Sequence, residues 1–166
     1  ILMYLGEKSN MFYPEDNRLE INQWLMAQMG LIGPMIGQHH QFHFYHQGKS
    51  EWGEERYFKI TRKLYEDLEA RLSASDYLAG KEYSIADMAS FPWVTAYKRF
   101  EVDLDSFVNV RRWFDAIKSR PAVRKGIEVG KEVRNFGKGI SKESLKTMFN
   151  QDAKSISKMA KAKREE

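Results

Sequence analysis

Apolar residues recur at intervals of three and four along most of the chain, which is the spacing of one face of an α-helix. The pattern predicts five helices, the first from about residue 14 or 15 to 45 and the others over about 52–72, 84–99, 107–119 and 121–133. Pro34 and Pro92 lie inside the first and third of these helices. A proline inside a helix removes a backbone donor, so we expect a bend at each. The sequence therefore predicts an all-α helical bundle.

The clearest helix start in the chain is the run SIADMASFPW, which begins at Ser84. Ser84 and Asp87 stand three residues apart, so their side chains are placed to accept from backbone N–H groups that a helix start leaves without partners. The residues that follow are apolar nearly all round, which is typical of a helix buried on most sides. We therefore interpret Ser84 and Asp87 as structural capping residues of a central helix, in preference to a catalytic role for the Asp87 carboxylate.

Several runs of the sequence resemble motifs of the cytosolic glutathione transferase family, in its all-helical C-terminal domain. Its LAG…SIAD signature is matched by residues 78–80 and 84–87, and the runs VRRW at 110–113 and SRPAV at 119–123 follow in the same order. The stretch 24–38, with WLM and GPMIGQ, is similar to the nu-class branch of bacterial disulfide-bond reductases and to the related Ure2-like proteins. The resemblance implies a glutathione-transferase C-terminal-like helical bundle.

The resemblance divides the chain into three parts. Residues 1–13 resemble the end of the last helix of a thioredoxin-like domain plus a linker, residues 14–133 resemble the helical domain, and residues 134–166 form a basic C-terminal extension. The chain opens inside an apolar helical pattern, without an initiator methionine. We therefore expect a fragment, with no catalytic residue of its own and with the thiol-activating residue upstream of Ile1.

The resemblance also implies a function. As part of the whole protein, this domain would supply the substrate pocket and the dimer interface of a glutathione-dependent transferase or disulfide-bond oxidoreductase. Its partners would be glutathione, a small electrophile or disulfide, and a second copy of the chain. The alternative is a non-catalytic interaction module, because the same helical fold serves as a docking domain in Ure2-like regulators and in translation complexes.

Arg56 stands early in the second predicted helix and matches the arginine that nu-class relatives extend toward glutathione. A guanidinium suits this role because it binds a carboxylate through two parallel hydrogen bonds. The resemblance therefore implies that Arg56 binds glutathione. From the residues alone, an exposed ion pair with Glu55 or another neighbour is the alternative.

All four histidines lie between residues 38 and 46. His39 and His43 have the i, i+4 spacing of two metal ligands on one helix face, but no third ligand accompanies them, so we predict no metal site. Packed or solvated rings are the simpler interpretation. The resemblance implies that this part of the first helix lines the substrate pocket, with Gln38, His39 and Phe42 as candidate residues.

The chain has 166 residues, of which 42% are hydrophobic, and this is enough for one globular domain with a core. The absence of cysteine excludes a disulfide framework and a cysteine nucleophile within the chain, and it fits a reducing, cytoplasmic location. No apolar run is long enough to span a membrane. The lysine-rich tail supplies much of the net charge of +4, but no aromatic residue alternates with its last lysines, so we expect no nucleic-acid partner.

Overall fold

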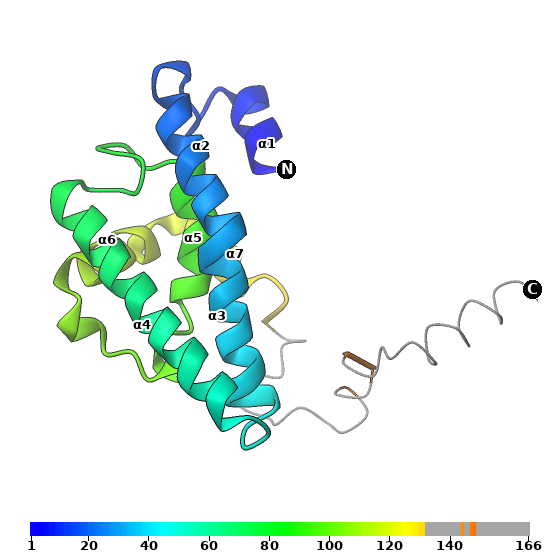
Figure 1. Ribbon diagram of the computed structural model, residues 1–166. Coiled ribbons are helices and arrows are strands. Elements are labelled where there is room, and N and C mark those ends of the chain that lie inside the picture. Colours follow the sequence, from blue (N-terminus) through cyan, green and yellow to red (C-terminus); the bar gives the residue numbers. More distant parts are fainter. Residues whose placement is uncertain (132–143, 145–146, 149–166) are drawn as a thin grey trace, which may run out of the picture. The chain divides into compact units, whose positions relative to one another are not determined.

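A computed structural model describes residues 1–131, 144, 147 and 148 of the chain (Figure 1). The chain divides into two compact units, Ile1–Lys125 and Gly126–Glu166. The α-helices are α1 Leu2–Ser9, α2 Arg18–Ala27, α3 Gly33–His40, α4 Glu51–Ala74, α5 Ile85–Val94, α6 Val108–Ser119 and α7 Pro121–Glu128. In the described part of the chain the only β-type pairing is an isolated bridge between Tyr77 and Gly80, so the fold is all-α as predicted.

One continuous helical segment runs from residue 15 to residue 45, as the pattern predicts, but its hydrogen bonding changes along its length. A 3₁₀ turn at Glu15–Asn17 leads into α2, and π-helical turns at Gln28–Ile32 and Gln41–Tyr45 lie on either side of α3. Pro34 follows the first π-helical turn and has no N–H to donate to a carbonyl one turn back. Where a bend is expected, at Pro34, the structure has a wider, π-helical turn just before the proline.

At Gly33 this long segment packs against Trp93 of α5. A Cβ atom at that position would lie 2.8 Å from Nε2 of Gln28 and 3.1 Å from the ring of Trp93. Both distances are shorter than ordinary van der Waals contacts, and Gln28 is itself buried. Glycine at this position therefore lets α3 and α5 pack against each other.

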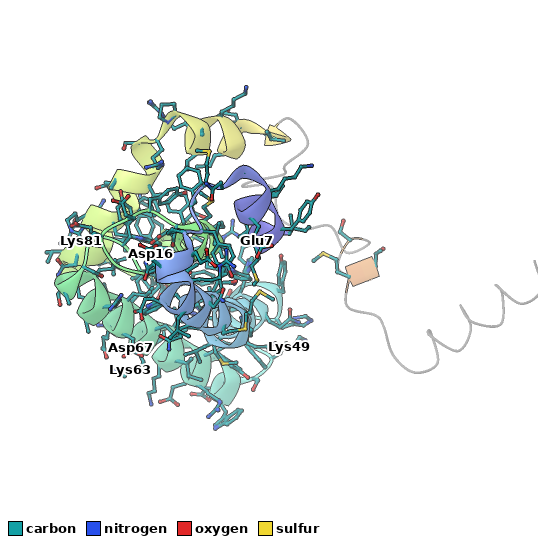
Figure 2. All side chains as sticks on the ribbon, turned by 90° about the horizontal axis from the view of Figure 1, so that it is seen from above. Glu7, Asp16, Lys49, Lys63, Asp67 and Lys81 are labelled. Atoms are coloured by element: carbon teal, nitrogen blue, oxygen red, sulfur yellow. The ribbon has the colours of Figure 1, made fainter. Side chains whose placement is uncertain are left out.

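The main hydrophobic core lies between α3, α4, α5 and α6. Its largest fully buried side chains are Ile36, Tyr65, Leu68, Leu72, Leu78, Val94, Leu104, Val110, Trp113 and Ile117. A second cluster joins the linker before α2 to the start of α5 through Tyr13, Ile21, Leu25, Ala79, Ile85 and Ala86. Charged side chains such as Lys63 and Asp67 of α4 point away from the bundle (Figure 2). This division places α5 at the centre, as its apolar sequence predicts.

Two helices end earlier than the pattern predicts. The third was expected to reach residue 99, but α5 stops at Val94 and only a 3₁₀ turn at Tyr97–Phe100 continues it. Thr95 donates its hydroxyl to the carbonyl of Pro92 at 2.6 Å, which satisfies a carbonyl that the helix end leaves free. The last helix, α7, stops at Glu128. The basic extension predicted for 134–166 lies outside the described residues except for positions 144, 147 and 148, which are helical.

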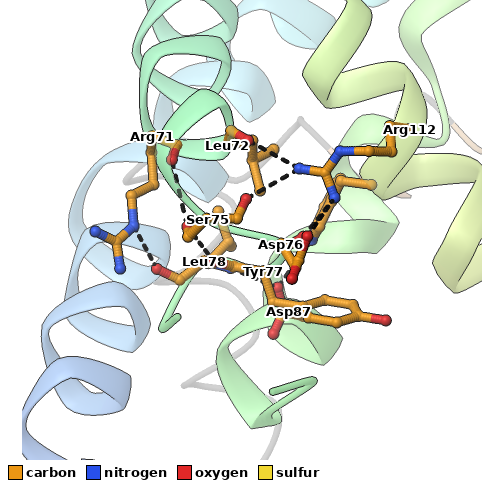
Figure 3. Close-up of polar contacts among 9 residues, drawn as sticks. Arg71, Leu72, Ser75, Asp76, Tyr77, Leu78, Asp87 and Arg112 are labelled. Carbon is orange, nitrogen blue, oxygen red and sulfur yellow. Dashed lines mark hydrogen bonds and ion pairs between the residues drawn. The ribbon is translucent and has the colours of Figure 1, made fainter. Parts of the chain in front are cut away.

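The connection between α4 and α5 is held by two arginines (Figure 3). Arg112 donates to the carbonyls of Leu72, Ser75 and Asp76 at 2.8, 2.9 and 3.1 Å, and Arg71 donates to the carbonyl of Leu78 at 2.8 Å. These bonds satisfy carbonyls at and after the C-terminal end of α4 with charged donors. The loop that leads into α5 is thereby fixed from both sides.

Candidate functional site

Asp87 lies at the start of α5 with no exposed surface and accepts four hydrogen bonds. Its Oδ2 atom accepts from the N–H of Ser84 at 2.9 Å and from the hydroxyl of Ser84 at 3.1 Å. Its Oδ1 atom accepts from the N–H of Leu78 at 2.9 Å and from Nε1 of Trp113 at 2.8 Å. Leu78 and Asp87 are labelled in Figure 3. Burial raises the pKa of this carboxyl, and the four donors oppose that rise.

The predicted capping box is present. The side chain of Ser84 accepts from backbone N–H groups in the first turn of α5, while the Asp87 side chain accepts from the N–H of Ser84. The Asp87 carboxylate is fully buried, and both of its oxygens accept hydrogen bonds from protein donors. The geometry therefore assigns Ser84 and Asp87 a structural role.

His39 lies inside the bundle, although the resemblance implied that its ring lines an open pocket. The side chain has no exposed surface, and Nδ1 lies 2.9 Å from the hydroxyl of Thr61 on α4. The rings of Phe58 and Phe100 pack around it at centroid distances of 6.0 and 4.8 Å. Burial first, and then the charges of the neighbouring histidines, lower the pKa of His39 to about 4. The pocket assignment does not fit this placement, because a fully buried ring contacts no substrate.

Gln38 and Phe42 occupy different positions from their neighbour His39. Gln38 is exposed, and the half-buried ring of Phe42 stacks on Tyr57 of α4, with centroids 5.2 Å apart and planes 15° apart. Phe42 also packs on Gly53, where a Cβ atom would lie 2.6 Å from the phenyl ring. The two side chains are available at the surface of the described chain, and their contact with a substrate stays a prediction.

Arg56 lies on the exposed surface of α4, with its guanidinium 5.4 Å from the ring centre of Trp52 and 6.0 Å from that of Tyr57. The alternative ion pair with Glu55 is not formed, because Glu55 pairs with Lys59. Within the described residues the guanidinium of Arg56 makes no ion pair. A guanidinium stacked on an aromatic face keeps its in-plane N–H groups free, so Arg56 is able to bind a carboxylate.

A cluster that the sequence did not reveal joins the end of the first long helix to the 3₁₀ turn after α5. Arg99 lies 3.2 Å from Nε2 of His40, and its guanidinium lies 4.9 Å from the ring centre of Phe44. Burial and then the charge of Arg99 lower the pKa of His40. These residues are 59 positions apart in the sequence, so periodicity within one helix carries no signal of their contact.

The described residues contain no cluster of three or more histidine, cysteine, aspartate or glutamate side chains suited to a metal ion. The pair His39 and His43 lies edge to face, with ring centroids 5.2 Å apart. In the described part of the chain no helix is both long and apolar enough to cross a membrane.

Comparison with known families decides the classification of the fold. Residues 29–121 match the model of the family described as glutathione S-transferase, C-terminal domain. The chain belongs to this family. The matched range begins in the π-helical turn before α3 and ends at the first residue of α7, so it contains the capping box, Arg56 and the cluster around Arg99.

Relatives of this glutathione transferase domain include two disulfide-bond oxidoreductases of Escherichia coli. The chain is 40% identical to YfcG over 129 residues, which cover 76% of the chain and 60% of YfcG. It is 34% identical to YghU over 135 residues, which cover 76% of the chain and 47% of YghU. Both fall in the branch that the sequence motifs indicate. The chain spans 60 to 64% of the length of the first curated relatives that it matches.

Solved structures of the family have the same fold. A glutathione transferase from Burkholderia graminis, with two glutathione molecules bound per subunit, is 38% identical, with a TM-score of 0.73 over 78% of this chain and 58% of that one. A glutathione transferase from Pseudomonas putida, with one glutathione disulfide bound per subunit, is 38% identical, with a TM-score of 0.70 over 77% and 59%. Ure2p in complex with glutathione is 28% identical, with a TM-score of 0.68 over 75% and 65%.

Proposed function

We propose that this chain is the helical part of a glutathione-dependent transferase or disulfide-bond oxidoreductase. Its co-substrate is glutathione, and its second substrate is a small electrophile or a disulfide. The observation that carries the proposal is the likeness, at 38% identity and a TM-score of 0.73, to a transferase that holds two glutathione molecules per subunit. The 40% identity to an enzyme named a disulfide-bond oxidoreductase points to the same chemistry.

Disulfide reduction by this protein requires sulfur atoms from outside the chain, which has no cysteine. In the proposed reaction the thiolate of one glutathione attacks a substrate disulfide, and the S–S bond breaks to give a mixed disulfide and a free thiol. A second glutathione then attacks the mixed disulfide, which yields glutathione disulfide and the second substrate thiol. Two electrons pass from two glutathione thiols to the substrate, and the two thiol protons end on the two product thiols. We assign stabilisation of the attacking thiolate to the part of the relatives' length that this chain does not span.

Arg56 is the residue of this chain that we assign to glutathione binding. Its guanidinium is exposed, stacked on Trp52 and without an ion pair among the described residues, so both in-plane edges are open to a carboxylate. We assign the neighbouring surface formed by Gln38 and Phe42 to the wall of the substrate pocket. His39 is the buried support behind that wall, because its ring packs between α3 and α4.

We further propose that the protein acts as a cytoplasmic homodimer. One face of the first long helix exposes Leu19, Met26 and Met29, with 75, 59 and 64% of their surface accessible. Apolar side chains grouped along one exposed helix are typical of a protein interface. The absence of cysteine fits a reducing compartment. Sedimentation of the protein and of a Met29→Glu variant tests the dimer: the variant should dissociate, and an unchanged mass would reject this face as the interface.

The enzymatic proposal is tested with the full-length gene product, glutathione and a small model disulfide such as bis(2-hydroxyethyl) disulfide, with glutathione disulfide formation as the readout. Arg56→Ala should raise the KM for glutathione about tenfold, which corresponds to the roughly 1.4 kcal/mol of a charge-assisted hydrogen bond. Arg62→Ala, on the same helix and also exposed, is the matched control and should leave the KM unchanged. Retention on a glutathione column without any turnover would support the alternative of a non-catalytic interaction module, and equal effects of the two substitutions would remove Arg56 from the site.

A further inference from the structure

A hollow of about 520 Å³ opens beside the linker that precedes α2. Its lining residues are Asn10, Phe12, Pro14, Tyr77, Glu82, Tyr83 and Arg120. None of them is a residue that we assign to the glutathione site. The hollow is large enough for a ligand of amino-acid or dipeptide size.

Three aromatic rings form the apolar part of this hollow. The ring of Tyr83 lies edge to face with Phe12 and also with Tyr77, with centroids 5.6 Å apart in each pair. Phe12 has a φ angle of +63°, a left-handed conformation that is rare and strained for a bulky residue. The carbonyl of Phe12 accepts from the N–H of Ile85 at 3.0 Å, which ties this strained residue to the start of α5. The backbone is therefore held in a rare conformation that directs the Phe12 ring toward Tyr83.

A half-buried cation forms the polar side of the hollow. The guanidinium of Arg120 lies 4.1 Å from the ring centre of Tyr83 and 5.9 Å from that of Phe12. Among the described residues it has no hydrogen bond or ion pair. Because stacking uses only the faces of a guanidinium, its in-plane N–H groups stay available for a carboxylate.

An anion lines the same hollow. Glu82 is exposed, and it does not pair with Arg120 or with any other cation of the described chain. Two opposite charges that share a hollow without touching each other complement a ligand that carries both signs. A carboxylate on the ligand pairs with Arg120, an ammonium group pairs with Glu82, and an apolar side chain lies against the rings of Phe12, Tyr77 and Tyr83.

We propose that this hollow binds a zwitterionic amino acid with an aromatic side chain, with Arg120 and Glu82 as the two charge contacts. The site is separate from the glutathione site and does not depend on the enzymatic function. For a ligand of about twelve non-hydrogen atoms, a Kd of about a millimolar is expected.

The test uses L-phenylalanine, 3-phenylpropanoate and 2-phenylethylamine as probes, and follows the backbone N–H signal of Ile85 by ¹⁵N–¹H nuclear magnetic resonance. Phenylalanine should bind most tightly, because each of the other probes lacks one charge. Arg120→Gln should weaken phenylalanine and 3-phenylpropanoate about tenfold and leave 2-phenylethylamine unchanged. Glu82→Gln should weaken phenylalanine and 2-phenylethylamine instead.

Arg124→Gln is the matched control for Arg120, because Arg124 lies four residues after Arg120, is exposed on α7 and does not line the hollow. Loss of the Arg120 stacking can loosen the linker, so the helical circular dichroism and Tm of each variant are compared with those of the parent. Glu82 is exposed, so Glu82→Gln should fold and can test the proposal even if Arg120→Gln unfolds. No shift of the Ile85 signal at 10 mM phenylalanine, equal binding of the three probes, or no response to Glu82→Gln would each overturn the proposal.

Discussion

Removal of the Asp87 carboxylate should lower the free energy of unfolding strongly. In an Asp87→Ala variant three N–H donors lose their acceptor at once, on Ser84, Leu78 and Trp113, which lie 2.8 to 2.9 Å from the carboxylate oxygens. Each buried donor left unsatisfied costs about 1–3 kcal/mol, while removal of a buried charge returns part of that cost. We expect a net loss of about 3–5 kcal/mol in the free energy of unfolding, a large share of the roughly 5–15 kcal/mol of a typical domain.

An Asp87→Asn variant replaces only one of the two carboxylate oxygens. An amide with its oxygen at the Oδ1 position still accepts from Leu78 and Trp113, but its NH₂ group then faces the N–H of Ser84. The two hydrogen bonds that Ser84 donates to Oδ2 are lost, and the NH₂ group faces the N–H donor of Ser84. We expect this variant to lose about 2–3 kcal/mol, less than the alanine variant.

The assay is urea unfolding followed by circular dichroism, applied to Asp87→Ala, Trp113→Phe and the double variant. Once the carboxylate is absent, loss of the indole N–H removes a donor that already lacks a partner. The double variant should therefore be about 1–2 kcal/mol more stable than the sum of the single losses predicts. Additivity to within about 0.5 kcal/mol would refute the claim that this hydrogen bond contributes to stability.

Three further predictions concern packing, capping and pH. Gly33→Ala should destabilise the fold by about 1–2 kcal/mol, because its Cβ would lie 2.8 Å from the Gln28 amide. Gly30→Ala should stabilise the fold by up to about 1 kcal/mol, because nothing lies within 4 Å of its Cβ. Thermal unfolding should therefore show a lower Tm for the first variant and a higher Tm for the second. Glu69→Gln should cost about 1–2 kcal/mol in urea unfolding, because the Glu69 carboxylate accepts from the first N–H groups of α6 at 2.9 to 3.1 Å. Burial lowers the pKa of His39 to about 4, so the unfolded chain takes up a proton on this imidazole at a higher pH than the folded chain. The free energy of unfolding should therefore decline by up to about 3 kcal/mol between about pH 6.5 and pH 4. A His39→Gln variant should not show this part of the decline.

The helices and their order are predictable from the sequence because their signals are local. The apolar period marks α4 and α6, and the S-x-x-D spacing marks the start of α5. The ends of the helices are less predictable, since they depend on contacts that periodicity does not record. The first N–H groups of α6 are capped by Glu69, which lies about 40 residues earlier in the chain. The early end of α5 depends on Pro92 and on the hydroxyl of Thr95.

The candidate site also contains residues whose surroundings the sequence predicts and others whose surroundings it does not, as His39 illustrates. The resemblance assigned a whole half-helix to the pocket, but a helix turns its side chains to different surroundings every residue. His39 follows Ile32 and Ile36 at intervals of seven and three, which is the spacing of one buried face, and all three side chains are buried in the structure. Gln38 lies one residue off that face and is exposed. Periodicity was therefore sufficient to place His39 on the buried face and Gln38 off it. A His39→Gln variant should lower the stability of the fold before it changes the KM for glutathione.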